Sequence, residues 1–311
     1  MLISDNALNV LAASEYRGVG KAWINKNLHG GESVEQIVSL IAMKDQSADA
    51  DGFRRKKDSI YEEIYRLGDA IDGATGIGDE AFPVIQKGVK EVDRPIVLFY
   101  KGDISLIKSA AGNVAVIGLL TPSEQIEMDE RKVVRKLVEQ GKCIVSGLAL
   151  GCDSVGHREA LACGGKTVAF LASQLSEVNP PSNRPLAAEI VERGGLLVSE
   201  YFRKVHSRRE FIGRYAERDR LQAMFSEAVV LAASHSQRDY GKDSGSRFAM
   251  GKAMEYKIPR YVIYDAARDG ANPMFNLSRE AIAKDARTIR PDDDFKMSAT
   301  MAPGSQLEFG I

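Results

Sequence analysis

The sequence has few cysteines, no excess of charge and no long apolar run. Its three cysteines, Cys143, Cys152 and Cys163, show no C-x-x-C spacing, which argues against a zinc site or a disulfide framework and indicates a reduced cytoplasm. No apolar run reaches the ~18 residues of a membrane helix, and the first ten residues do not resemble a secretory signal. With 42 basic and 43 acidic residues the formal net charge is −1, so any polyanion would have to bind a local basic surface.

Common catalytic motifs are missing as well. The chain contains no H-E-x-x-H, no G-x-S-x-G, no P-loop and no paired metal carboxylates, so we expect no catalytic residue, no metal and no cofactor. Glu200 follows an apolar run, where it could act as an acid or base. It could equally form a partly buried ion pair with Arg218 or Arg220.

Length and patterning predict two domains and a tail. The 311 residues, 44% of them hydrophobic, allow one large soluble domain and a smaller one. Residues 1–75 have helical spacing, and Gly18–Gly20 between two short helices indicates either a helix-hairpin-helix turn or a plain connection. Residues 76–290 form the predicted core. The tail 291–311 is irregular, and we expect it to be mobile.

From residue 95 onward, short Val/Ile/Leu-rich runs alternate with amphipathic stretches. The runs occupy residues 95–100, 113–118, 142–147, 166–172, 195–200, 227–233 and 260–265. The stretches occupy 124–139, 154–163, 185–193, 216–225 and 246–256. This alternation predicts an α/β fold with a doubly wound, mostly parallel, Rossmann-like sheet of buried strands. Ligands of such sheets bind beyond the carboxyl ends of the strands.

The segment 146–157 leaves one of these strands through two glycines. Gly147 and Gly151 let the backbone approach a ligand closely, and Asp153 stands where a helix N-cap is expected. The start of this helix favours an anion. His157 lies on the same helix face as Asp153. It is either part of a phosphate-binding loop or a structural histidine.

Two further stretches carry binding signals. Ser244, Gly245 and Ser246 precede the last predicted helix, with Ser246 as a plausible N-cap, and their donors suit a phosphate or serve as simple caps. The stretch 203–220, expected to be a connection after a strand, holds seven Lys or Arg residues and interleaved aromatics. Guanidinium groups bind phosphates and aromatic faces stack on unpaired bases, although a solvated charged surface would look similar.

Five motifs in this order resemble the DNA-processing protein A (DprA, or Smf) family. They are Ser146-Gly147-Leu148-Ala149-x-Gly151-x-Asp153-x-x-x-His157, Pro180-Pro181-x-Asn183-Arg184, Ser199-Glu200, Arg218-Asp219-Arg220 and Ser244-Gly245-Ser246. The resemblance implies a SLOG-type fold with a small helical N-terminal domain and a protein that binds single-stranded DNA without catalysing a reaction. It also implies a homodimer that hands DNA to a RecA-type recombinase during recombination or the uptake of transforming DNA.

On this reading the phosphates contact the strand-end loops and nearby arginines. The expected contacts are Gly118, Ser146, Gly147, Gly151, Asp153, His157, Asn183, Arg184, Arg214, Arg218, Arg220, Ser244, Gly245 and Ser246. The chain departs from the family pattern where Leu120 replaces an arginine, where Pro181 stands at a position that is lysine in some members, and where Asp219 replaces an asparagine.

A nucleotide-binding or nucleotide-cleaving enzyme is the alternative. The related LOG-type phosphoribohydrolases carry a Pro-Gly-Gly-x-Gly-Thr-x-x-Glu loop at the place of residues 242–250. This chain lacks the Pro-Gly-Gly and the threonine, and residue 249 is alanine where that motif has glutamate. The motif therefore favours DNA binding over this enzyme, without excluding nucleotide sensing.

Overall fold

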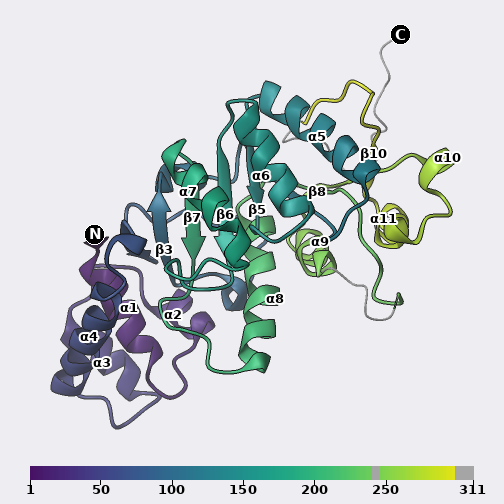
Figure 1. Cartoon of the computed structure of the whole chain (residues 1–311). Coiled ribbons are helices and arrows are strands. Elements are labelled where there is room, and N and C mark those ends of the chain that lie inside the picture. The colour runs from purple at the N-terminus through teal and green to yellow at the C-terminus, as the bar shows by residue number, and fades with distance from the viewer. Residues whose placement is uncertain (240–244, 298–311) are drawn as a thin grey trace.

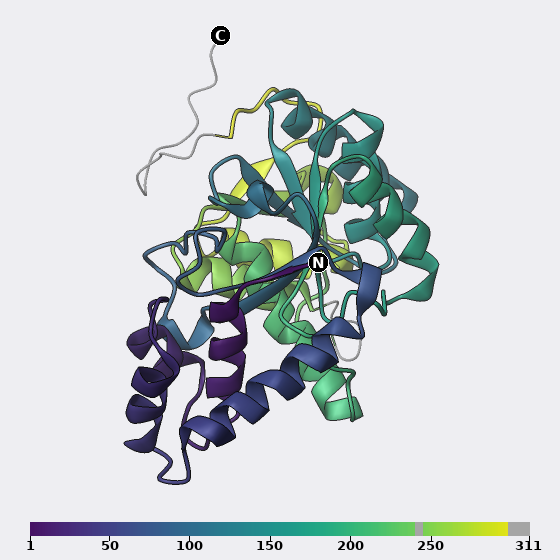
Figure 2. The ribbon, with the colours of Figure 1, turned by 90° about the vertical axis from the view of Figure 1, so that its left-hand side faces the viewer.

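The computed structural model describes residues 1–239 and 245–297, in which one sheet is covered by helices on both faces (Figures 1 and 2). The strands in these residues are Leu2–Ile3 (β1), Gly73–Gly76 (β2), Val97–Gly102 (β3), Asn113–Ile117 (β4), Cys143–Ser146 (β5), Thr167–Leu171 (β6), Leu196–Ser199 (β7), Ala228–Leu231 (β8), Arg260–Ile263 (β9) and Arg287–Ile289 (β10). Their order across the sheet is β1-β2-β3-β7-β6-β5-β4-β8-β9-β10.

The helices divide into an N-terminal group and a group that covers the sheet. The first group is Asp5–Ser14 (α1), Lys21–Asn27 (α2), Val34–Ala42 (α3) and Ala50–Tyr65 (α4). The second is Glu124–Glu139 (α5), Cys152–Ala162 (α6), Arg184–Glu192 (α7), Arg208–Met224 (α8), Ser246–Glu255 (α9), Ala266–Asp269 (α10) and Asn276–Ile282 (α11). Short 3-10 turns lie at Gly68–Ala70, Glu91–Asp93, Ile104–Ile107, Pro181–Asn183 and Pro273–Phe275.

All seven predicted strands are present, and the Rossmann-like α/β prediction is confirmed. One direction is wrong, however. We expected the run at 95–100 to be parallel to the others, but β3 is antiparallel to both of its neighbours, β2 and β7. The other pairings are parallel. An apolar run shows that a strand is buried but carries no information about its direction.

The strand order reverses between β4 and β8. The chain proceeds from β4 through β5 and β6 to β7 in one direction, then returns to place β8 on the other side of β4. In Figure 2 the teal helices lie on one side of the sheet and the green and yellow ones on the other. The crevice at the carboxyl ends of β4 and β8 is therefore the position where a doubly wound sheet binds its ligand.

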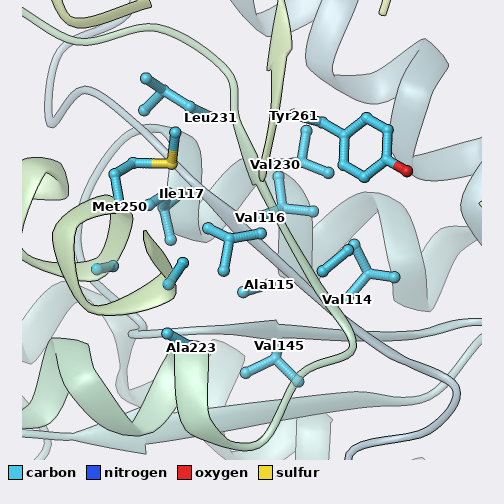
Figure 3. Packing of buried hydrophobic residues seen from close by; sticks show 14 of the residues in the cluster. Val114, Ala115, Val116, Ile117, Val145, Ala223, Val230, Leu231, Met250 and Tyr261 are labelled. Atoms are coloured by element: carbon cyan, nitrogen blue, oxygen red, sulfur yellow. The ribbon is translucent and has the colours of Figure 1, made fainter. Parts of the chain in front are cut away.

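A buried apolar core supports this edge of the sheet. Val114, Val116 and Val230 are fully buried in β4 and β8, and Met250 of α9 lies beside Ile117 in the same buried cluster (Figure 3). Burying such side chains stabilises the fold by roughly 1.5–3 kcal/mol each. The strand ends are thereby held in fixed positions.

The N-terminal helices share their core with one side of the sheet. Phe53 of α4 and Ile24 of α2 belong to the same buried cluster as Phe99 of β3 and Leu197 of β7. The domain boundary predicted at residues 75 and 76 falls inside β2.

The first part of the predicted tail is packed against α5. Lys132 forms an ion pair with Asp292 at 2.7 Å, the backbone N–H of Met297 donates to Gln140, and Met297 is buried. Residues 298–311 lie outside the described residues, so the expectation of a mobile tail stays a prediction for them alone. Across the described part of the chain, no helix has the length and apolar character needed to cross a bilayer.

Candidate nucleic-acid interface

A pocket of about 480 Å³ opens at the crevice between β4 and β8, beside α8 and the start of α9. We call it the switch-point pocket. Of the predicted site residues, it is lined by Gly118, Asp153, Arg218, Gly245 and Ser246. These residues come from four separate segments of the chain. The rule that loops after parallel strands meet at one edge accounts for the position of Gly118, Asp153, Gly245 and Ser246, whereas Arg218 comes from within α8.

The loop between β5 and α6 is held by one carboxylate. Asp153 accepts backbone N–H groups from Gly147 (3.1 Å) and Ala149 (3.2 Å). Our expectation that Asp153 caps the helix is wrong, because the N-cap is Gly151, whose φ of 69° lies in the region that favours glycine. Burial raises the pKa of Asp153, while Arg218 opposes that rise.

The side chains of Ser146 and Asn183 also form hydrogen bonds with other groups of the protein. The buried Ser146 hydroxyl donates to the Val116 carbonyl of β4 at 2.7 Å. The Asn183 amide donates to the Leu148 carbonyl and to the Ser154 hydroxyl, both at 2.9 Å. Both side chains fix the β5–α6 loop, and neither lines the pocket.

Of the two alternatives for His157, a part of a phosphate-binding loop or a structural histidine, the structure shows the structural one. It is fully buried, and the Thr167 hydroxyl, which donates to the Ile144 carbonyl at 2.7 Å, accepts Nδ1–H of His157 at 2.6 Å. Nε2 is buried and has no hydrogen-bond partner among the described residues. Burial and the nearby Arg218 lower the pKa of His157 to about 3, so the ring is neutral at physiological pH.

Between about pH 4 and 6, wild-type unfolding free energy should rise more steeply with pH than that of a His157→Gln variant. An unfolded histidine takes up a proton near pH ~6.5, whereas the folded ring does so only near 3. The unfolded state then binds more protons, so stability is lost as pH falls through this window. Urea titrations should show a slope difference approaching about 1.4 kcal/mol per pH unit. Equal slopes would mean that folded His157 is charged.

Arg218 lies at the base of the pocket, and its guanidinium is engaged by the protein. It is 4% exposed, its Nη1 donates to the carbonyls of Gly147 and Phe170, and its Nε lies 3.0 Å from Asp219. Arg218 therefore joins β5, β6 and α8. Two carbonyls engage its Nη1, whereas its Nε makes no hydrogen bond among the described residues.

Arg214 and Arg220 require a correction, because neither presents a guanidinium to solvent. The stretch expected to be a loop is mostly the helix α8. Arg214 donates to the Arg203 carbonyl at 2.9 Å and to Glu210, while Arg220 forms a buried bidentate pair with Glu200 at 2.6 and 2.7 Å. Burial raises the pKa of Glu200, but Arg220 and Lys21 more than offset it, so the pKa is below its usual value. Of the two roles considered for Glu200, the structure shows the ion pair.

The remaining predicted residues are divided between the pocket and the surface. Gly245 is the N-cap of α9, not Ser246 as expected, and the Ser246 hydroxyl donates to the Gly118 carbonyl at 3.0 Å. Ser244 lies outside the described residues. Arg184 is exposed at the first residue of α7 and does not line the pocket.

Sequence reasoning missed most of the pocket's apolar rim. Leu120, Ile212 and Phe248 line the pocket and are 48%, 60% and 37% exposed. Phe211, which the sequence did point to, lies among them, 4.9 Å from Tyr215 edge to face. The available signal was the spacing of Phe211, Ile212 and Tyr215 on one face of a helix, hidden by the charges around them.

Comparison with known proteins supports the family resemblance. The sequence model of the family described as DNA recombination-mediator protein A matches residues 74–297. DNA processing protein DprA of Streptococcus pneumoniae is 30% identical over 268 residues, 82% of this chain and 87% of that protein. Protein Smf of Synechocystis is 36% identical over 139 residues, 44% of this chain and 34% of that protein.

Two solved structures share the fold. The X-ray structure of the Streptococcus pneumoniae protein superposes with a TM-score of 0.69 at 23% identity, covering 93% of this chain and 95% of that one. DNA processing protein A of Helicobacter pylori, studied for its single-stranded DNA binding mode, gives 0.55 at 24% identity and covers 69% and 90%. With the family match spanning most of the sheet, the chain belongs to the DNA recombination-mediator protein A (DprA) family.

Proposed function

We propose that this chain binds single-stranded DNA at the switch-point pocket and acts as a non-catalytic mediator of recombination. The observation that carries the proposal is a pocket with an exposed aromatic rim at the ligand-binding edge of a doubly wound sheet. The family match and the DNA-binding relative from Helicobacter pylori support the same assignment.

The rim favours unpaired bases over a duplex. Phe211 and Phe248 are partly exposed on α8 and α9, and the Arg247 guanidinium lies 4.0 Å from the centre of the Phe248 ring. Aromatic side chains stack on any unpaired base, whereas bases within a duplex already stack on each other. A pocket of this volume accommodates a base turned out from the strand.

Phosphate contacts are assigned to exposed cations instead of the buried arginines. Arg208 and Arg209 lie in the first turn of α8, whose first half projects beyond the sheet in Figure 1, and Arg184 is exposed at the start of α7. Gly118 and Ser246 contribute the pocket wall. The carboxylates of Asp153 and Asp219, which also line the pocket, disfavour a phosphate deep inside it.

Phe211→Ala and Phe248→Ala should each weaken binding to single-stranded DNA by about 5- to 150-fold, because a stacked base contributes roughly 1–3 kcal/mol. Fluorescence anisotropy with a labelled oligonucleotide measures the loss. Met128→Ala removes an equally exposed apolar side chain from α5 and should bind as wild type does. Wild-type affinity in both phenylalanine variants would show that single-stranded DNA does not bind at the pocket.

The dependence of affinity on salt and on DNA strandedness tests whether the chain is a single-stranded DNA-binding protein. Wild-type protein should prefer single-stranded to double-stranded DNA, and its affinity should fall steeply as salt rises. Incubation with nucleoside monophosphates tests the enzymatic alternative, and a released base would establish that alternative. Ala249, where the phosphoribohydrolase motif has glutamate, lines the pocket and cannot exchange a proton.

The proposed setting follows from the family and the free thiols. We propose a cytoplasmic homodimer that delivers single-stranded DNA to a RecA-type recombinase. Cys143, Cys152 and Cys163 are free cysteines, which fits a reduced compartment. Light scattering of the purified chain and pull-down of the recombinase in the presence and absence of DNA test the two partners.

A further inference from the structure

A second hollow, of about 710 Å³, lies between the N-terminal helices and the sheet. We call it the interdomain groove. Its walls come from the end of α4, the loop after β6 and the segment that leads from β7 to α8. The lining residues are Glu63, Arg66, Leu67, Gln174, Ser176, Glu177, Phe202, Arg203, Lys204 and His206.

The cations of the groove differ in how firmly they are paired. Arg203 is bound to Glu63 at 2.6 Å and to Glu15 at 2.9 Å, so it joins the two parts of the chain. Arg66 is 73% exposed and lies 3.6 Å from Glu62, while Lys204 is 67% exposed and pairs with Glu177. Exposed pairs of this kind contribute little to stability, so a phosphate can replace either carboxylate at low cost.

One segment of chain, residues 203–212, contributes to both the groove and the switch-point pocket. Arg203, Lys204 and His206 line the groove, and Phe211 and Ile212 line the pocket. The exposed Arg208 and Arg209 lie between them. A polyanion leaving the pocket along this segment therefore meets positive side chains as far as the N-terminal domain.

Arg214 links the two ends of this segment. Its guanidinium donates to the Arg203 carbonyl at 2.9 Å and stacks 4.1 Å from the centre of the Tyr201 ring. The start of α8 and the wall of the groove are therefore held at a fixed relative position. A preorganised track loses less conformational entropy when it binds than a mobile loop would.

We propose that the interdomain groove is a second phosphate-binding subsite for the same DNA strand, with Arg66 of the N-terminal domain and Lys204 as its contacts. This inference rests on the proposed function. It extends the interface from the sheet edge to the helical domain. It also sets the length of DNA required, because an oligonucleotide that fills only the pocket does not reach Arg66.

An Arg66→Gln/Lys204→Gln variant tests the subsite with oligonucleotides of two lengths. We choose strands of about 4 and about 16 nucleotides, the lower and upper limits of common single-strand site sizes, and expect the short strand to fill the pocket alone and the long one to reach both sites. We expect the variant to bind the short strand as wild type does and the long strand about tenfold more weakly. The slope of log affinity against log salt for the long strand should fall by about 1.4, or about 0.7 for each lost phosphate contact.

An Arg193→Gln/Lys132→Gln variant is the matched control. It removes two cations that also form exposed ion pairs, with Glu189 and Asp292, and it makes the same change in net charge. If the Arg66/Lys204 variant binds the long strand with the affinity and salt slope of this control, the subsite is ruled out. If the long strand binds wild type but the short one does not, the assignment of the switch-point pocket as a DNA site fails. The subsite is then judged from the long strand alone, by comparing the Arg66/Lys204 variant with the control.

Discussion

Gly147→Ala is expected to lower the free energy of unfolding by about 3–5 kcal/mol and to weaken binding to single-stranded DNA more than tenfold. A Cβ at this position would overlap the Arg218 guanidinium and contact the Gln222 amide at 2.5 Å. The displaced guanidinium would lose its bonds to the carbonyls of Gly147 and Phe170. Asp219, 3.0 Å from Nε, would remain, but a buried charge that loses most of its partners costs several kcal/mol.

The same displacement would remodel the pocket, because Arg218 and Asp153 both line it. Urea unfolding measures the stability, and binding is then measured at a temperature where the variant remains folded. Gly251→Ala on α9 is the matched control, since nothing lies within 4 Å of the new Cβ, and it should be neutral or stabilise by about 0.5–1 kcal/mol. A loss below 1 kcal/mol for Gly147→Ala would contradict this account of the loop.

Arg220→Met should also lower the free energy of unfolding by about 3–5 kcal/mol, because it leaves Glu200 buried without its bidentate partner. Replacing both partners, as in Arg220→Met/Glu200→Leu, should recover most of that loss, since apolar side chains of similar volume substitute well for a buried ion pair. Lys21 keeps a second carboxylate, Glu217 at 3.0 Å. Urea unfolding of the two variants measures the recovery.

The double variant also separates structure from binding. If Arg220 is purely structural, the folded double variant binds single-stranded DNA with wild-type affinity. A folded double variant that has lost DNA binding would restore Arg220 as a phosphate contact. Arg193→Met, which breaks an exposed pair with Glu189, should change stability by less than about 0.5 kcal/mol.

The seven apolar runs were sufficient to predict the seven adjacent strands from β3 to β9 across the sheet, because each run is a buried strand. The strands that were missed are short or poor in apolar residues: β1 has two residues, β10 has three and β2 reads GATG. These strands pair at or near the two edges of the sheet. Their pairing depends on neighbours that the local sequence does not identify.

The strand-end loops were predictable, and the roles of their side chains were not. Strand–helix alternation alone brought Gly118, Asp153 and Ser246 to one edge, because parallel strands end together. The structural role of His157 depends on its hydrogen bond with Thr167 in the next strand. No pattern within residues 146–157 reveals that neighbour.

The sequence by itself determined the family, the buried strands and the edge of the sheet where the pocket lies, because hydrophobic periodicity and motif spacing are local properties of the chain. Tertiary structure alone decided which charges remain available to a ligand. Arg214, Arg218 and Arg220 lie in a basic stretch, yet carbonyls and carboxylates contributed largely by other segments bury them, among them Gly147, Phe170 and Glu200. A charged side chain is buried only where the fold brings such partners close to it. Because these partners are distant along the chain, the local sequence does not identify them.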